Sequence, residues 1–199
     1  MHVDCYASLN SPWAYLGSRR IEAICARHGA SLRLWPVDFS VIFPASGGLP
    51  LPQRAPQRQA YRLVELARWR DHLGVPLTLQ PRHFPMNEAP VANAVIALRE
   101  TEGDAPAIRL AHRVMAALWA EDANPADPST FAALAAECGL DGPALLRAAE
   151  DPRWAAMRQA DSEAALARGV FGAPSYVIEG EIFWGQDRLD FVDRRLAHA

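Results

Sequence analysis

Cysteine is scarce in this chain and never occurs as a pair at Cys-x-x-Cys spacing. The 199 residues include only Cys5, Cys25 and Cys138. A chain of this length, with 50% apolar residues, can bury a sizeable core without disulfides. Three scattered thiols therefore argue against a disulfide framework and against a dithiol redox site. We expect a reducing, cytoplasmic location, with all three thiols buried as small apolar groups.

Long apolar runs and basic blocks are also missing. No cationic segment near Asp4 leads into an apolar stretch, and Asn93 interrupts the apolar run around Ala89 to Leu98. The sequence therefore predicts neither a signal peptide nor a membrane span. The 20 basic and 23 acidic side chains give a net charge of -3, so nucleic acid is not an expected partner. The histidines lack metal-ligand spacing, and no metal site is expected.

Both ends of the chain show strand patterns. The first segment has a strand, an amphipathic helix and a second strand, which predicts a right-handed, parallel βαβ unit. The last segment has two short strands around Gly180, followed by an amphipathic helix. The expected bounds are His2 to Ala7, Pro12 to about His28, and Ser31 to Val37, then Ser175 to Glu179, Glu181 to Trp184, and Asp187 to Ala197.

The middle of the chain is different in character. Asp38 to Gln57 is rich in proline and glycine, and we expect an irregular loop there. Apolar periodicity and capping residues then predict a long helical region. Its helices are expected at Arg58 to Leu73, Asn87 to Glu102, Ala105 to Glu121, Ser129 to Cys138, Gly142 to Ala149 and Pro152 to Arg168. These elements predict an α/β, thioredoxin-like domain of residues 1–55 and 169–199 with an inserted helical domain of residues 56–168.

Two short motifs could carry chemistry. Ser11-Pro12-Trp13-Ala14 lies where a strand meets a helix, at the position of a redox Cys-x-x-Cys, and a helix N-terminus there favours a thiolate. Ser11 is equally well explained as a helix N-cap. Ala173-Pro174 places a proline at the start of a strand, and the sequence leaves the isomer of this peptide bond open.

Several runs together resemble a known family. Gly169 to Pro174, Phe183-Trp184-Gly185-Gln186-Asp187-Arg188-Leu189, Ser11-Pro12 and Arg82-His83-Phe84-Pro85 are similar to the 2-hydroxychromene-2-carboxylate isomerases and their relatives, the kappa-class glutathione transferases. The resemblance covers nearly the whole chain and implies the DsbA-like branch of the thioredoxin fold.

The resemblance implies glutathione as cofactor and an aromatic keto acid as substrate. Ser11 would hydrogen-bond the sulfur and hold it as thiolate. Ala173, beside Pro174, would dock the peptide through its backbone. The γ-glutamyl end would bind at a four-residue segment that begins at the end of the last strand, where the Asp187 carboxylate would pair with its ammonium group. The alternative is that Asp187 is only a helix cap. The segment consists of Trp184, Gly185, Gln186 and Asp187.

One part of the chain departs from the family. A lysine expected after a phenylalanine is replaced in Phe43-Pro44, so a cation is missing. Gln53-Arg54 stands where the family has an asparagine pair, which makes Arg54 a candidate for the missing charge. Arg58 is a second candidate for a carboxylate, and Phe84 is the expected aromatic wall, although arginines are most often solvated surface.

Three functions stay open at this stage. The leading one is a glutathione-dependent isomerase that regenerates its thiol. The second is a kappa-like transferase or peroxidase that consumes glutathione, and the third is a thiol-peptide binding module without catalysis. The resemblance also implies a homodimer.

Overall fold

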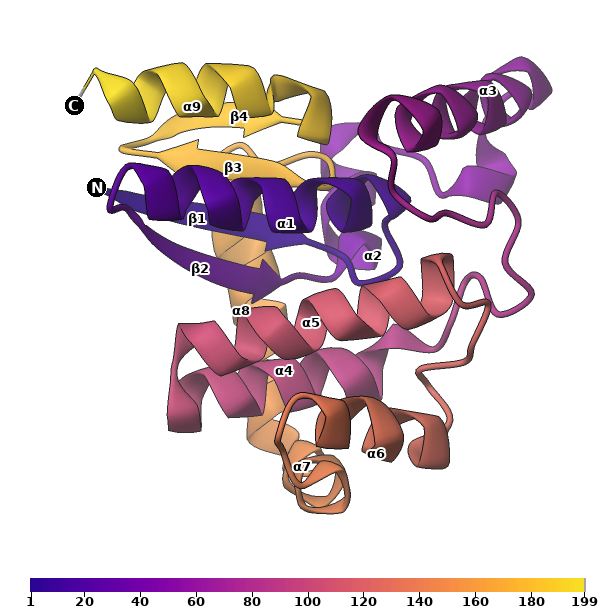
Figure 1. The fold of residues 1–199 in the computed structure, drawn as a ribbon, viewed down its shortest axis with the longest axis vertical. Helices are drawn as coiled ribbons and strands as arrows, with labels where there is room; N and C mark the ends of the chain where they lie inside the picture. The colour runs from indigo at the N-terminus through magenta and orange to yellow at the C-terminus, as the bar shows by residue number, and fades with distance from the viewer. Residues whose placement is uncertain (199) are drawn as a thin grey trace.

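A central sheet is built from both ends of the chain in the computed structural model, which describes residues 1–198 (Figure 1). Strand β1 (His2–Ala7), helix α1 (Pro12–Arg27) and strand β2 (Ser31–Pro36) form the first unit. β1 and β2 pair in parallel from His2–Ser31 to Ala7–Pro36. The predicted βαβ unit is confirmed.

The C-terminal segment completes the sheet. Strand β3 (Ser175–Ile178) is antiparallel to β1, and strand β4 (Glu181–Trp184) is antiparallel to β3, so the strand order is β2-β1-β3-β4. A short 3-10 turn, η2 (Gln186–Arg188), precedes helix α9 (Leu189–Ala197). Helices α1 and α9 lie side by side on one face of the sheet (Figure 1).

The predicted loop of residues 38–57 was wrong in part, because it contains helix α2 (Phe39–Ser46) with Pro44 inside it. Asp38 caps the helix by accepting from the Ser40 N–H at 2.8 Å, and Phe39 and Ile42 are buried. These contacts outweigh the one backbone bond that Pro44 cannot donate. A 3-10 turn, η1 (Leu51–Gln53), then leads to helix α3 (Pro56–Leu73).

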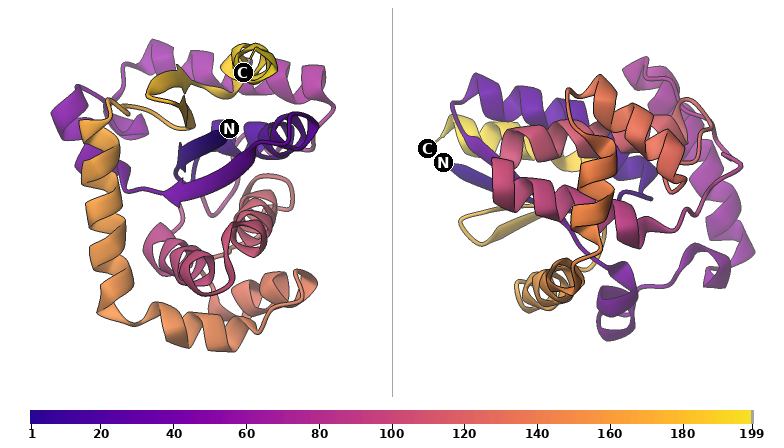
Figure 2. Two further views of the ribbon diagram at one scale, coloured as in Figure 1. Left: turned by 90° about the vertical axis from the view of Figure 1, so that its left-hand side faces the viewer. Right: turned by 90° about the horizontal axis from the view of Figure 1, so that it is seen from below.

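The helical region follows the predicted pattern to within two residues at each end. It consists of α4 (Glu88–Glu102), α5 (Asp104–Trp119), α6 (Pro128–Glu137), α7 (Gly142–Ala149) and α8 (Pro152–Ala167). Asp127, Asp141 and Asp151 each cap the next helix through a side-chain oxygen. Helix α8 crosses behind the sheet and returns the chain to β3 (Figures 1 and 2). No helix within residues 1–198 is long and apolar enough to cross a membrane.

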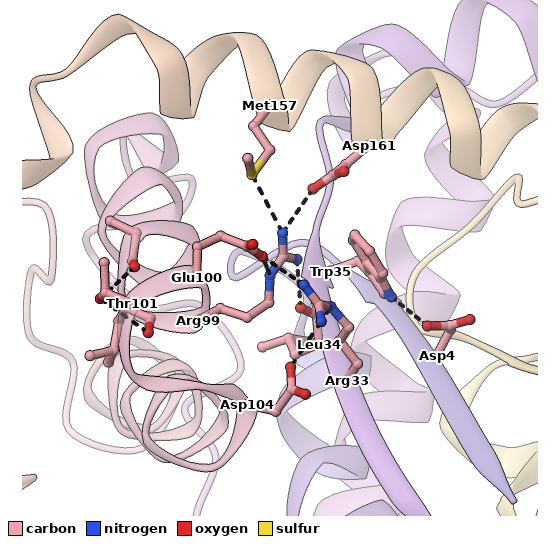
Figure 3. Close-up of polar contacts among 12 residues, drawn as sticks. Asp4, Arg33, Leu34, Trp35, Arg99, Glu100, Thr101, Asp104, Met157 and Asp161 are labelled. Atoms are coloured by element: carbon pink, nitrogen blue, oxygen red, sulfur yellow. Dashed lines mark hydrogen bonds and ion pairs between the residues drawn. The ribbon is translucent and has the colours of Figure 1, made fainter.

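A buried charge network joins the helical region to the sheet (Figure 3). The side chain of Arg99 on α4 is 1% exposed, and it donates to the Leu34 carbonyl at 3.1 Å and to Asp161 on α8 at 3.2 Å. Its guanidinium also lies 4.4 Å from the ring centre of Trp35. Arg33 on β2 bonds Glu100 at 2.6 Å. The network therefore fixes α4 and α8 against the edge strand β2.

One hydrophobic core continues from the sheet into the helices. It includes Val3 of β1, Leu16 of α1, Val95 of α4 and the fully buried Trp119 at the end of α5. The predicted sheet domain and helical insertion thus pack on shared apolar side chains; the domain boundaries themselves stay a prediction.

Candidate functional site

Ser11 is the N-cap of α1. Its Oγ accepts from the Ala14 N–H at 3.2 Å, and its backbone φ and ψ of -82° and 118° are those of an N-cap. The capping bond uses a lone pair of the hydroxyl oxygen, so the hydroxyl proton is left to donate elsewhere. Ser11 can therefore cap the helix and donate to an anion at the helix N-terminus at the same time.

The cis-proline segment reaches the same end of the sheet. The Ala173–Pro174 bond is cis. Tyr6 pairs with Ser175, so Pro174 lies at the end of β1 from which the chain leads to Ser11. The Pro174 carbonyl also accepts from the Gly185 N–H at 2.8 Å. The structure thus brings the Ser11 motif, the Pro174 segment and the Gly185 turn together.

The turn after β4 depends on glycine. Gly185 has a φ of 102°, and a Cβ on it would lie 2.3 Å from an oxygen of Asp187. Asp187 is exposed, does not cap a helix, and accepts from Arg188 at 2.7 Å. The glycine therefore leaves room that the Asp187 carboxylate occupies.

The two neighbours of Gly185 are placed very differently. Gln186 is 1% exposed, and Arg20 donates to both its backbone and its side-chain oxygen. Trp184 is 52% exposed and packs against Phe171 with ring centres 4.8 Å apart, directly over Gly172. Gln186 thus packs inside the fold, whereas Trp184 offers an aromatic surface beside Ala173.

The segment that contains Phe84 is tied to the loop before Ser11. The Asn10 side chain accepts from the Met86 N–H at 2.9 Å and donates to the Met86 carbonyl at 3.1 Å. Phe84 is half-buried against Trp119, with ring centres 4.9 Å apart. The same segment, whose Phe84–Pro85 bond is also cis, borders an open depression that Asn124 and Ala126 also line. The segment that carries the expected aromatic wall is therefore tied to the loop before Ser11, and the Phe84 ring itself packs against Trp119.

Three arginines gather between the end of η1 and the first half of α3. Arg54 donates to the Leu49 carbonyl at 2.8 Å, and its pKa is lowered by burial and by the charge of Arg58. Arg62 was missed from the sequence; its guanidinium lies 5.3 Å from the Phe84 ring centre and 5.7 Å from that of Trp119. Burial and the charge of Arg54 lower its pKa to about 10. Arg62 could have been found in the sequence from its position four residues after Arg58, because this spacing places both side chains on the same face of a helix.

The charges of these arginines are not paired with a carboxylate in the described part of the chain. Among residues 1–198 none of the three forms an ion pair with a carboxylate. The chain contains no lysine, and the exposed Pro44 occupies the position where one was expected. Gln53 is exposed on η1. The group formed by Arg54, Arg58 and Arg62 is therefore a cationic cluster able to receive an anion.

The thiols of the chain lie outside this site. Cys5 and Cys25 are buried as predicted, and burial raises the pKa of both, to about 11 for Cys25. Cys138 is only half-buried, which corrects the prediction; its place near the end of α6 leaves one side open. Burial raises its pKa as well. Within the part of the chain that the structure describes, no group of His, Cys, Asp and Glu could hold a metal ion.

Comparison with known proteins agrees with the fold and with the family resemblance. The family described as DSBA-like thioredoxin domain matches residues 2–197. A 2-hydroxychromene-2-carboxylate isomerase of Sphingobium xenophagum is 29% identical over 98% of this chain and 97% of the relative. A solved structure of such an isomerase has a TM-score of 0.83 at 26% identity and covers 100% of this chain and 95% of that chain. The resemblance predicted from the sequence is confirmed.

A more distant structure shares the fold. The cytosolic disulfide reductase DsbM from Pseudomonas aeruginosa, solved with GSH, has a TM-score of 0.67 at 20% identity and covers 99% of this chain and 100% of that chain.

Proposed function

Because the chain belongs to the DSBA-like thioredoxin family and carries serine in place of a redox cysteine, we propose that it is a glutathione-dependent isomerase of the 2-hydroxychromene-2-carboxylate type. Its substrate would be an aromatic keto acid with a conjugated double bond. The observation that carries the proposal is the Ser11 hydroxyl, a free donor at the N-terminus of α1. The names of the relatives and the GSH-containing neighbour support it.

The residues present fit glutathione. The Ser11 hydroxyl and the first N–H groups of α1 would favour the thiolate over the thiol, whose ordinary pKa is about 8.5. The N–H and C=O of Ala173 would pair with the cysteinyl backbone as an added strand, beside Pro174. Asp187 would receive the γ-glutamyl ammonium group, with Trp184 and Gly185 beside it and the backbone of Gln186 completing the turn.

When bound, glutathione would supply a thiolate that adds reversibly to the conjugated carbon, so that the former double bond can rotate before the sulfur leaves. The chain would orient the substrate for this step. Arg54, Arg58 and Arg62 would bind its carboxylate, and Phe84 would pack against its ring. Gln53 is the neutral polar group beside them.

The test is replacement of the Ser11 hydroxyl. Ser11→Ala should lower turnover by about 10- to 100-fold, the cost of losing one positioned donor. Ser11→Thr keeps a hydroxyl and a cap, so it should retain most of the activity and separate catalysis from helix stability. Undiminished glutathione-dependent turnover in Ser11→Ala would remove Ser11 from the mechanism.

Counting thiols separates isomerase from transferase. During substrate conversion, an isomerase leaves the concentration of free glutathione constant, whereas a transferase or peroxidase lowers it. Tight glutathione binding without turnover of any substrate would instead indicate a binding module.

A further inference from the structure

The four residues from Ser8 to Ser11 decide where the catalytic hydroxyl lies. They connect β1 to α1 and form a compact turn, in which the Ser11 N–H donates to the Ser8 carbonyl at 3.0 Å. The Asn10 N–H donates to the Ser8 hydroxyl at 3.1 Å. Two bonds between the Asn10 side chain and the Met86 backbone also tie the turn to the segment before α4.

Glu88, the first residue of α4, fixes this turn from outside. Its Oε1 accepts from the Leu9 N–H at 2.8 Å. Its Oε2 accepts from the Ser8 hydroxyl at 2.6 Å and from the Asn10 side-chain amide at 3.1 Å. One carboxylate thus contacts three consecutive residues that directly precede Ser11, from a point almost eighty positions along the chain.

The carboxylate of Glu88 is held in the interior by a positive charge. Its side chain is 12% exposed, and Arg158 of α8 lies 3.5 Å from its Oε1. Arg158 also lies 3.5 Å from Asp38 and donates to the Pro36 and Val37 carbonyls. Burial raises the pKa of Glu88, and Arg158 together with the three donors opposes this. A buried charge is costly unless it is paired and hydrogen-bonded, and Glu88 meets both conditions through Arg158 and its bonds to the Ser8–Ser11 turn.

We propose that Glu88 is a positioning residue, which holds the Ser8–Ser11 turn so that the Ser11 hydroxyl points at the sulfur of bound glutathione. This inference rests on the function proposed above and extends the site into the helical region.

The first test titrates the bound thiol. Glu88→Gln keeps the shape of the side chain but places an NH₂ group against one of the donors. The ultraviolet absorbance of thiolate should show glutathione titrating about one pKa unit higher on this variant, which lowers the thiolate fraction by up to about tenfold at pH values below that pKa. The matched control is Asp161→Asn, another half-buried carboxylate held by an arginine, because Asp161 does not touch the Ser8–Ser11 turn.

A double-mutant cycle separates positioning from general stability. If Glu88 acts through Ser11, Glu88→Gln should shift the titration far less in a Ser11→Ala background than in the wild-type background. An equal shift in both backgrounds would overturn the proposal.

Hydrogen exchange provides a readout without glutathione. Glu88→Gln should speed exchange at the Leu9 and Ser11 amides about tenfold and leave the amides of α5 unchanged. If the wild-type protein bound no glutathione, the proposed function would be contradicted. Hydrogen exchange would still show whether Glu88 holds the Ser8–Ser11 turn. Unchanged exchange at the Leu9 and Ser11 amides in Glu88→Gln would overturn the proposed role of Glu88. Should Glu88→Gln not fold, Ser8→Ala removes one of the three contacts and should raise exchange at Ser11 in the same direction.

Discussion

The Ser11 hydroxyl shows how one side chain can serve structure and chemistry together. Its oxygen accepts from Ala14, while its proton is left for a ligand. Alanine at position 11 would remove both contacts, and threonine would keep both. Capping and ligand binding, which the sequence presents as alternatives for Ser11, are therefore compatible at this residue.

Arg62 offers a second prediction about a single side chain. Arg62→Met preserves packing on Phe84 and Trp119 but removes the charge. We expect the KM for an acidic substrate to rise about tenfold with a smaller change in kcat, because a charged hydrogen bond contributes about 1.5–3 kcal/mol. Steady-state kinetics would measure this.

Arg68→Met, on the same helix, is the matched control for Arg62. Arg68 is exposed and bound to Glu65 at 2.6 Å, so its loss should leave KM unchanged. Equal KM values in the Arg62 variant and the wild type would contradict a substrate role for the cationic cluster.

Among helices and strands, local signals predicted most boundaries. The helices predicted to begin at Ser129, Gly142 and Pro152 begin within one residue of those positions, and the structure caps each start with a neighbouring aspartate. Helix α2 was missed because Pro44 is usually a helix breaker. Burial of Phe39 and Ile42 against distant parts of the chain decided the outcome there, and such burial has no local signature.

The contact between α1 and α5 predicts a pH-dependent stability. Ser18 donates to the Tyr15 carbonyl at 2.8 Å, so it accepts from Nδ1–H of a neutral His112 at 2.7 Å. Burial, with the charges of Arg19 and Arg113, lowers the pKa of His112 from 6.5 to about 4. As the pH falls, the unfolded chain therefore binds a proton at His112 before the folded chain does. The contribution of neutral His112 to the free energy of unfolding is complete above pH 6.5 and is lost as the pH falls toward 4.

We expect the wild type to lose about 1–2 kcal/mol through His112 between about pH 7 and pH 5, less than the full shift implies because the ring is partly exposed. Urea unfolding of the wild type and of His112→Asn at both pH values measures this. The variant should lose correspondingly less on acidification. An identical loss in both proteins would show that His112 does not titrate between the two states in this range.

For the molecule as a whole, the shared core predicts that sheet and helices unfold together. Arg99→Met would leave Asp161 and the Leu34 carbonyl without their buried partner, and the free energy of unfolding should fall by about 3–5 kcal/mol. Urea unfolding followed by both circular dichroism and tryptophan fluorescence should give one coincident transition.

Arg19→Met controls for the loss of any arginine. Its exposed pair with Glu22 should contribute less than about 1 kcal/mol. Two separate transitions in the Arg99 variant would contradict a single cooperative core.

The limits of sequence reasoning are clearest in long-range contacts. The βαβ unit, the hairpin and the resemblance of residues 169–174 follow from neighbouring residues. The bonds of Asn10 to Met86 and of Glu88 to Leu9 join segments far apart in the chain, and no periodicity or cap encodes them. The helical insertion could be predicted, but not its part in holding the serine turn.

The placement of the cysteines has a physiological consequence. In the glutathione-dependent reaction proposed at Ser11, the chain would contribute no sulfur of its own, and the pKa values of Cys5, Cys25 and Cys138 are all raised. Peroxide and other oxidants attack thiolates, so they would find little to react with on the protein itself. During oxidative stress the activity would follow the reduced glutathione pool and return with it, without repair or replacement of the enzyme.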